Sequence, residues 1–322
     1  MRVLIEAGVK GWEIIEYREF LKSAQEYFGE PNVQQLVIRQ RWLQPLQLFL
    51  ELFRGKYDVY IFSPRTLSSS YLPAIFQAFL VLIITSVLRV RVHSCLSDAQ
   101  IRLFRHLSLI VCMHNGVIHC LISPTPLIRS YFPFANLRGP YMLPISRITF
   151  DYVDEICKTT TRDIDVCVPG LLYRERREIL EPVICKLKDQ GFHVVVSQRS
   201  SSGKRSSDYE YWKMMASAKI VLTTSVPTKE VASLGLDNSP HLIYRYLEAL
   251  VCGSLLVCNR APSNSFIEPN IHYVPFDSGS DIYSIILYFL ENTAYAQSVS
   301  LAGRDAAKQI IETYVFWSQI TR

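Results

Sequence analysis

Short apolar runs alternate with amphipathic segments along the first half of the chain. Runs rich in β-branched residues predict strands, and segments whose apolar residues recur every three or four positions predict helices. Such alternation is typical of right-handed βαβ units around a mostly parallel sheet, so the first half predicts a Rossmann-like lobe. The predicted strands are RVLIEA (2–7), QLVIR (35–39), YDVYIFS (57–63), RVRVHSC (89–95), LSLIVCM (107–113) and GVIHCLIS (116–123), with helices over 14–28, 45–54, 71–88 and 99–107.

The alternation stops after GPYMLPIS (139–146) and resumes with DIDVCVPG at residue 163. We therefore predict an N-terminal domain over 1–150, a C-terminal domain over 151–309, and a last helix over 310–322. The aromatic residues of that last segment need an apolar surface, so we expect it to pack back on the N-terminal domain. The predicted fold is α/β, with two Rossmann-like lobes and a cleft between them. The second lobe has predicted strands at 164–168, 192–197, 219–225, 254–259 and 271–276, and helices at 174–189, 208–217, 240–251, 280–291 and 295–318.

The composition is that of a folded protein with a large core. Of its 322 residues, 49% are hydrophobic and 20% are charged, which excludes disorder for most of the chain. The net charge of +5 is too small and too scattered for a nucleic-acid-binding protein. The eight cysteines form no CxxC motif and no zinc-ligand spacing, and the chain opens without a signal-peptide pattern. These features predict free thiols in a cytoplasmic protein.

One uncharged stretch, YLPAIFQAFLVLIITSVL (71–88), approaches the roughly 20 residues that a membrane-spanning helix needs. A predicted strand follows it at once, and a spanning helix would separate that strand from the rest of its sheet. We therefore expect a helix that does not span. It is either buried in the protein or in contact with a membrane surface through one face, which would place the protein at the inner membrane face.

The most informative stretch is SPHLIYRYLEALVCGSLLVCN (239–259). Ser239 followed by Pro240 predicts a helix start, with serine as N-cap. His241, Arg245 and Glu248 would then form one polar row on an otherwise apolar helix.

This polar row has two interpretations. It is either an ion pair between Arg245 and Glu248 on a helix surface, or part of a ligand site at the carboxyl edge of a sheet. In the second interpretation the helix N-terminus at Ser239 and His241 holds a diphosphate, and Glu248 accepts hydrogen bonds from ribose hydroxyls. Gly253 would allow a tight turn into the next strand.

The same stretch carries a family resemblance. HLIYRYLEALVCGSLLVCNRAP (241–262), followed by FIEPNIHYVPF (266–276), resembles the donor-binding lobe of GT-B glycosyltransferases, especially the exostosin-like and spore-coat-type branches of group 1 with their Arg-x-x-Glu-Ala-Leu helix. RDIDVCVPGLLYRERREIL (162–180) is similar to the strand, glycine turn and arginine-bearing helix that open that lobe. The resemblance covers residues 160–318.

The resemblance implies roles for individual residues of a donor site. Glu248 would bind the donor ribose, with Arg245 supporting the same site and Gly253 keeping the next turn close. Gly170 would let the backbone approach the diphosphate, beside Arg174 and Arg177 on the next helix. The alternative for the arginine run that includes Arg176 is a solvated helix face. Three residues at predicted strand ends would flank the nucleotide base through backbone or hydroxyl groups: Ser197, Thr224 and Ser225.

The catalytic base is expected from the N-terminal lobe. Asp98, Glu13 and His114 each follow a predicted strand, where each could equally be a loop or capping residue. Retaining families often have a second glutamate eight positions before the ribose-binding one, but here that position is Pro240, so the resemblance assigns neither inversion nor retention. No DxD-like cluster appears on a plausible loop, and we expect transfer without a metal ion or another cofactor.

The resulting hypothesis is a hexosyltransferase-like enzyme that uses a nucleotide-sugar donor and a polysaccharide, lipid-linked or protein acceptor. A dinucleotide-dependent oxidoreductase is the alternative enzyme, but neither EAGVKGWE nor VPGLLYRE supplies its Gly-x-Gly-x-x-Gly turn. A non-catalytic, two-lobed binding protein is the third possibility, and such proteins are normally secreted.

Overall fold

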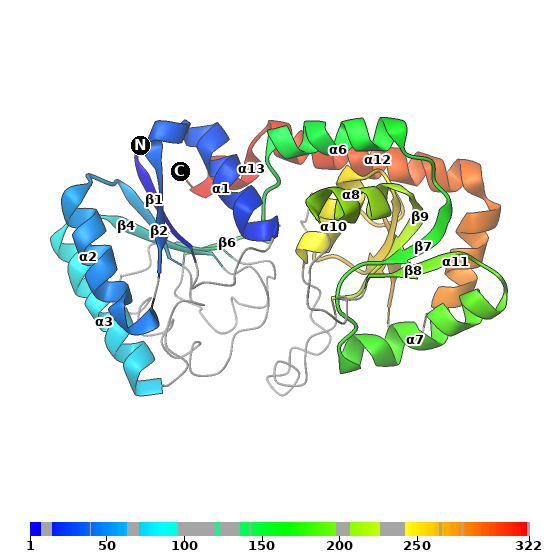
Figure 1. Ribbon diagram of the computed structural model, residues 1–322, viewed down its shortest axis with the longest axis horizontal. Helices are drawn as coiled ribbons and strands as arrows, with labels where there is room; N and C mark the ends of the chain where they lie inside the picture. The colour runs from blue at the N-terminus through cyan, green and yellow to red at the C-terminus, as the bar shows by residue number, and fades with distance from the viewer. Residues whose placement is uncertain are drawn as a thin grey trace. The chain divides into compact units, whose positions relative to one another are not determined.

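The computed structural model divides the chain into two compact units, described here one at a time (Figure 1). Unit 1 contains Met1–Ser146 together with Tyr314–Arg322, and unit 2 contains Arg147–Thr313. The structure describes residues 1–7, 15–38, 40–62, 71–95, 120–122, 136–141, 143–197, 207–225, 242–263, 266–277 and 280–320.

Unit 1 is built on a parallel sheet with the strand order β2-β1-β3-β4-β5-β6. The chain runs from β1 to β2 in one direction and then crosses back through β3 to β4. With right-handed crossovers, α2 and α3 cover one face of the sheet and α1 covers the other. The elements are β1 (Val3–Ala7), α1 (Ile15–Phe28), the 3-10 turn η1 (Glu30–Asn32), β2 (Val33–Val37), the 3-10 turn η2 (Arg41–Leu43), α2 (Gln44–Arg54), β3 (Val59–Phe62), α3 (Tyr71–Val87), β4 (Arg91–Cys95), β5 (Cys120–Ile122), β6 (Leu137–Arg138) and α13 (Val315–Ile320).

The short helix α13 completes unit 1 from the far end of the chain. Its Trp317 is fully buried, and the ring contacts Phe20 and Phe28 of α1 with centroids 4.8 and 5.4 Å apart. The indole Nε1 donates a hydrogen bond to the hydroxyl of Ser23 at 2.9 Å. Phe316 adds an edge contact to Phe20 at 5.5 Å. The aromatic residues of the last helix thus have α1 as their apolar surface.

Unit 2 has a five-stranded parallel sheet with the order β11-β10-β9-β7-β8. Because every described pair is parallel, the carboxyl ends of these strands share one edge of the sheet. The elements are α6 (Arg147–Thr159), β7 (Ile164–Val168), α7 (Arg174–Asp189), β8 (Val194–Val196), α8 (Asp208–Ala216), β9 (Ala218–Leu222), α10 (Tyr244–Val251), β10 (Leu255–Asn259), β11 (Val274–Phe276), α11 (Ile282–Glu291) and α12 (Thr293–Glu312).

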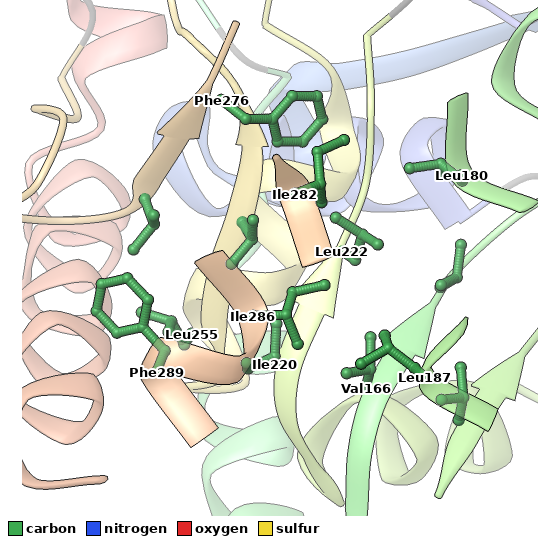
Figure 2. Close-up of a cluster of buried hydrophobic side chains, with 14 of the residues drawn as sticks. Val166, Leu180, Leu187, Ile220, Leu222, Leu255, Phe276, Ile282, Ile286 and Phe289 are labelled. Carbon is green, nitrogen blue, oxygen red and sulfur yellow. The ribbon is translucent and has the colours of Figure 1, made fainter. Parts of the chain in front are cut away.

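The core of unit 2 lies between its sheet and the helices α7 and α11. Figure 2 shows Ile220 and Leu255 of the strands beside Ile286 and Phe289 of α11, and Val166 beside Leu187 of α7. The strands are apolar on successive residues, as expected where both faces of a parallel sheet are covered. Helices α6, α8, α10 and α12 contact one another in a second layer, and α10 and α12 also contact β10. This core fixes the strand ends that carry the candidate site.

Several elements differ from the sequence prediction. The run after residue 146, taken as an interruption, forms α6, with Phe150, Val153 and Ile156 buried at helical spacing. The helix predicted at 295–318 is split into α12 and α13 by Tyr314, whose φ is +47°. The short strand β6 was not predicted. The helix over 99–107 and the strand over 107–113 lie outside the described residues.

The strongly apolar segment near residue 80 forms α3, which has 17 residues. Within the described part of the chain, no helix combines the length and the apolar character needed to cross a membrane.

Candidate functional site

The turn after β7 and the start of α10 meet at the carboxyl edge of the sheet of unit 2. Gly170 has a φ of +85°, a conformation that glycine adopts without strain. A Cβ atom at this position would lie 2.7 Å from Nε of Arg245 on α10. Glycine therefore suits the turn, and a larger residue here would displace the Arg245 guanidinium. The structure brings together two residues predicted from separate motifs.

A buried arginine holds this turn in place. The guanidinium of Arg176, in the first turn of α7, donates to the carbonyls of Leu171 and Pro169 at 2.8 and 3.2 Å. It also donates to the hydroxyl of Thr223, just after β9, at 3.4 Å. Burial, with the nearby charge of Arg245, lowers the pKa of Arg176 to about 10, so it remains charged near neutral pH. Arg176 thereby ties the turn to the neighbouring strand end, and a solvated helix face is not its environment.

Glu248 lies one helical turn after Arg245 and is only 4% exposed. Its Oε2 accepts a hydrogen bond from the hydroxyl of Tyr211, on α8, at 2.7 Å. Burial and the charge of Glu248 raise the pKa of Tyr211 well above its usual value, so the phenol stays a donor. A carboxylate oxygen can accept more than one hydrogen bond, which leaves Glu248 chemically suited to bind hydroxyl groups. The interpretation as an exposed ion pair on a helix surface is wrong.

The start of α10 differs from the prediction at Ser239 and Pro240. The helix begins at Tyr244, and its N-cap is Ile243, which makes no side-chain capping bond. Arg245 therefore stands in the first helical turn, where the helix dipole disfavours a cation. An anion bound there would offset this unfavourable charge.

The predicted strand-end residues also reach the carboxyl edge. Thr224 and Ser225 follow Thr223 after the end of β9, and both are buried. The N–H of Ser225 donates to Oδ1 of Asn259 at 2.9 Å, and that of Ser197 donates to the carbonyl of Val168 at 3.1 Å. The backbone contacts expected of Ser197 and Ser225 are thus already made within the fold. The side chain of Ser225 is also hydrogen-bonded to Tyr246. The hydroxyl of Ser197 stays a candidate contact for a nucleotide.

Three other predicted residues divide between the two edges of the sheet. Arg174 and Arg177 are exposed in the first turn of α7, next to the Gly170 turn. Arg174 pairs with Glu178 at 2.9 Å, and Arg177 donates to the carbonyl of Leu172 at 3.4 Å. Gly253 has a φ of +62° and forms the expected tight turn, but it precedes β10 and so lies at the opposite, amino edge. The structure does not bring Gly253 together with the other site residues.

The remaining predictions fall on parts of the chain that are not described. They are the candidate bases Glu13, Asp98 and His114, and the N-terminal residues of the predicted helix, Ser239 and His241. Across the residues that the structure does describe, no three His, Cys, Asp or Glu side chains are grouped as metal ligands would be.

Sequence reasoning missed two residues that shape the site, Tyr211 and Asn259. Tyr211 follows a capping box that starts α8, in which Ser207 and Glu210 bond reciprocally. A tyrosine on the buried side of such a helix needs a hydrogen-bond partner for its hydroxyl, and this need could have pointed to Tyr211 as a site residue. Asn259 is a polar residue at the carboxyl end of an apolar strand, the edge where ligands bind, and this position could have pointed to it.

We compared the chain with known protein families and solved structures. The family described as glycosyl transferase-like matches residues 174–314. The structure of HepE from Anabaena, solved with UDP, aligns over 100% of this chain and 100% of its own, with a TM-score of 0.60 and 12% identity. Sucrose-phosphate synthase from Thermosynechococcus elongatus covers 100% of this chain and 99% of its own, with a TM-score of 0.59 and 11% identity.

A glycosyltransferase from Rickettsia africae has the same coverage, with a TM-score of 0.57 and 9% identity. No curated protein matches the sequence. At these identities the structural neighbours establish the fold. Residues 174–314 thus match the glycosyl transferase-like family, and the chain has the two-lobed α/β fold of these GT-B glycosyltransferase structures, as its sequence resemblance predicts.

Proposed function

We propose that the protein is a glycosyltransferase that takes its sugar from a nucleotide-sugar donor bound at the carboxyl edge of unit 2. The observation that carries the proposal is the buried Glu248 carboxylate, one turn from an arginine that packs on the Gly170 turn. Ribose hydroxyls are suitable donors to such a carboxylate, and a diphosphate is a suitable partner for the guanidinium. HepE, solved with UDP and with UDP-glucose, has the same fold and makes a uridine nucleotide the first donor to test.

The cations around the turn suggest how the leaving diphosphate is stabilised. Arg245 lies against the turn, and Arg174 and Arg177 project from the helix that follows it. Positive charge placed where negative charge develops is a large contributor to catalysis of group transfer. We propose that these arginines serve in place of a metal ion, and that the transferred group is a hexose. The proposed acceptor is a polysaccharide, a lipid-linked glycan or a protein.

The donor site is tested by titrating UDP, GDP, ADP and NAD into the purified protein by calorimetry. We expect a nucleoside diphosphate to bind and NAD not to bind. In Glu248→Gln the affinity should fall by about 1.5–3 kcal/mol, the usual scale for a hydrogen bond to a charged group. Tyr211→Phe keeps the carboxylate, so it should cost about 1 kcal/mol of stability and leave the affinity within about twofold.

Glu291→Gln, on an exposed end of α11, is the matched control and should change neither quantity. Unchanged nucleotide affinity in Glu248→Gln would remove the donor-site assignment. Tight binding of NAD alone would instead favour the oxidoreductase.

The proposed metal independence gives a separate prediction. Because arginine side chains supply the positive charge, the affinity for the nucleoside diphosphate should change by less than about twofold when EDTA replaces magnesium. Parallel titrations in the two buffers measure this. A loss of about tenfold or more in EDTA would contradict the proposal and indicate a metal-bound diphosphate.

A further inference from the structure

The outward side of α2 in unit 1 is apolar, although the inward side already supplies core residues. Trp42, in the turn η2, and Leu46 and Phe53, in α2, recur at helical spacing on the outward side. Trp42 and Phe53 are 73% and 72% exposed. On the inward side Leu48 and Leu52 are buried. A helix of an ordinary monomer has a polar outward side, so this arrangement requires an explanation.

Helix α3 repeats the arrangement. Phe76, Ile83 and Val87 lie on one side of the helix, and Phe76 and Val87 are 62% and 73% exposed. None of the 17 residues of α3 carries a charge. Because α2 and α3 pack against each other and lie side by side (Figure 1), their exposed sides are neighbours. We call these exposed sides of η2, α2 and α3 the outer face. Contiguous apolar surface of this kind marks an interaction site.

The charges at one end of the outer face indicate the chemistry of the partner. Both helices end at the amino edge of their parallel sheet, and four exposed cations lie at these ends or just after them: Arg54, Lys56, Arg89 and Arg91. The two carboxylates nearest to these cations in sequence are already engaged. Glu51 accepts a hydrogen bond from Tyr57 at 2.9 Å, and Asp58 accepts one from the backbone N–H of Arg2 at 2.7 Å. Both carboxylates keep their negative charge, but the four cations outnumber them, so the end of the outer face is cationic.

We propose that the outer face binds the surface of an anionic lipid bilayer. Aromatic and aliphatic side chains of a helix lying in the membrane plane enter the boundary between headgroups and acyl chains, and basic residues beside them contact lipid phosphates. A second copy of this chain fits less well, because it would bring the same excess of cations to the contact. The inference rests on unit 1 alone and does not depend on the donor site of unit 2.

Vesicle flotation of the full chain tests the proposal. We expect binding to vesicles of phosphatidylcholine with about 30% phosphatidylglycerol, and much weaker binding to phosphatidylcholine alone. Phe53→Ser with Phe76→Ser should lower binding to anionic vesicles by about tenfold or more. Arg54→Gln with Arg89→Gln should lower it by about fivefold per cation, and added salt should reproduce this loss.

The matched control is Tyr288→Ser with Leu301→Ser, two exposed large side chains of unit 2, and this variant should bind vesicles like the parent. UDP titration and melting curves on each variant show that folding and the donor site are intact, which separates this test from that of the proposed function. Absence of vesicle binding, or equal binding to neutral vesicles, overturns the proposal. So does a concentration-dependent dimer in sedimentation that Phe53→Ser with Phe76→Ser abolishes.

Discussion

Replacing Arg176 by methionine should lower the free energy of unfolding by about 3 kcal/mol. Methionine has a similar length but no donors, so the carbonyls of Leu171 and Pro169 and the hydroxyl of Thr223 would lose their common partner inside the fold. The bonds to Pro169 and Thr223 are buried, and leaving a buried acceptor without a partner costs about 1–3 kcal/mol, part of which relaxation of the turn recovers. Thermal and chemical denaturation of both proteins measure the difference.

The same substitution should also weaken binding of the nucleoside diphosphate by about tenfold or more, because the turn that carries Gly170 is no longer tied to β9. Arg174→Met is the stability control. Its ion pair with Glu178 is exposed, so the expected loss is at most about 0.5 kcal/mol. A loss below about 1 kcal/mol in Arg176→Met would show that the guanidinium does not hold the turn.

The second large effect is expected at Trp317, in the other unit. Trp317→Ala removes a fully buried ring that contacts Phe20 and Phe28, and it removes the hydrogen bond to Ser23. Large-to-small changes of buried aromatic residues cost about 3–5 kcal/mol. Trp317→Phe, which keeps most of the ring packing and loses the hydrogen bond, should cost about 1 kcal/mol.

Calorimetry with and without UDP shows which of the two units loses stability in Trp317→Ala. A bound ligand raises the melting transition of the part that binds it, so UDP should mark the transition of unit 2. Trp317→Ala should lower the other transition and leave UDP affinity unchanged. A drop confined to the UDP-sensitive transition would contradict the placement of α13 in unit 1.

The parts of the site that sequence could predict are those governed by local periodicity. Arg245 and Glu248 are three residues apart on an apolar segment, and this spacing alone places them on one side of a helix. Gly170 follows a strand and precedes a helix, which is the local signature of a turn. The two parallel sheets were predictable for the same reason, because strand and helix patterns alternate along the chain.

What could not be predicted depends on contacts between distant segments. Three arginines lie close together at the start of α7, and nothing local distinguishes the buried Arg176 from its exposed neighbours. The partnership of Tyr211 with Glu248 joins residues 37 positions apart. The capping signal at Ser239 and Pro240 was misleading, because the helix begins four residues later, at Tyr244. Element boundaries of this kind are decided by tertiary packing more than by local preference.

The position of α13 has a consequence for the order in which the protein folds during synthesis. Residues 1–146 leave the ribosome first, but the surface of α1 that bears Phe20 and Phe28 is covered only when residues 314–320 have been made. Unit 2 is a continuous segment and can complete its core before then. The first unit to be synthesised is thus the last to be finished, and until then its aromatic surface is exposed to chaperones and to neighbouring chains.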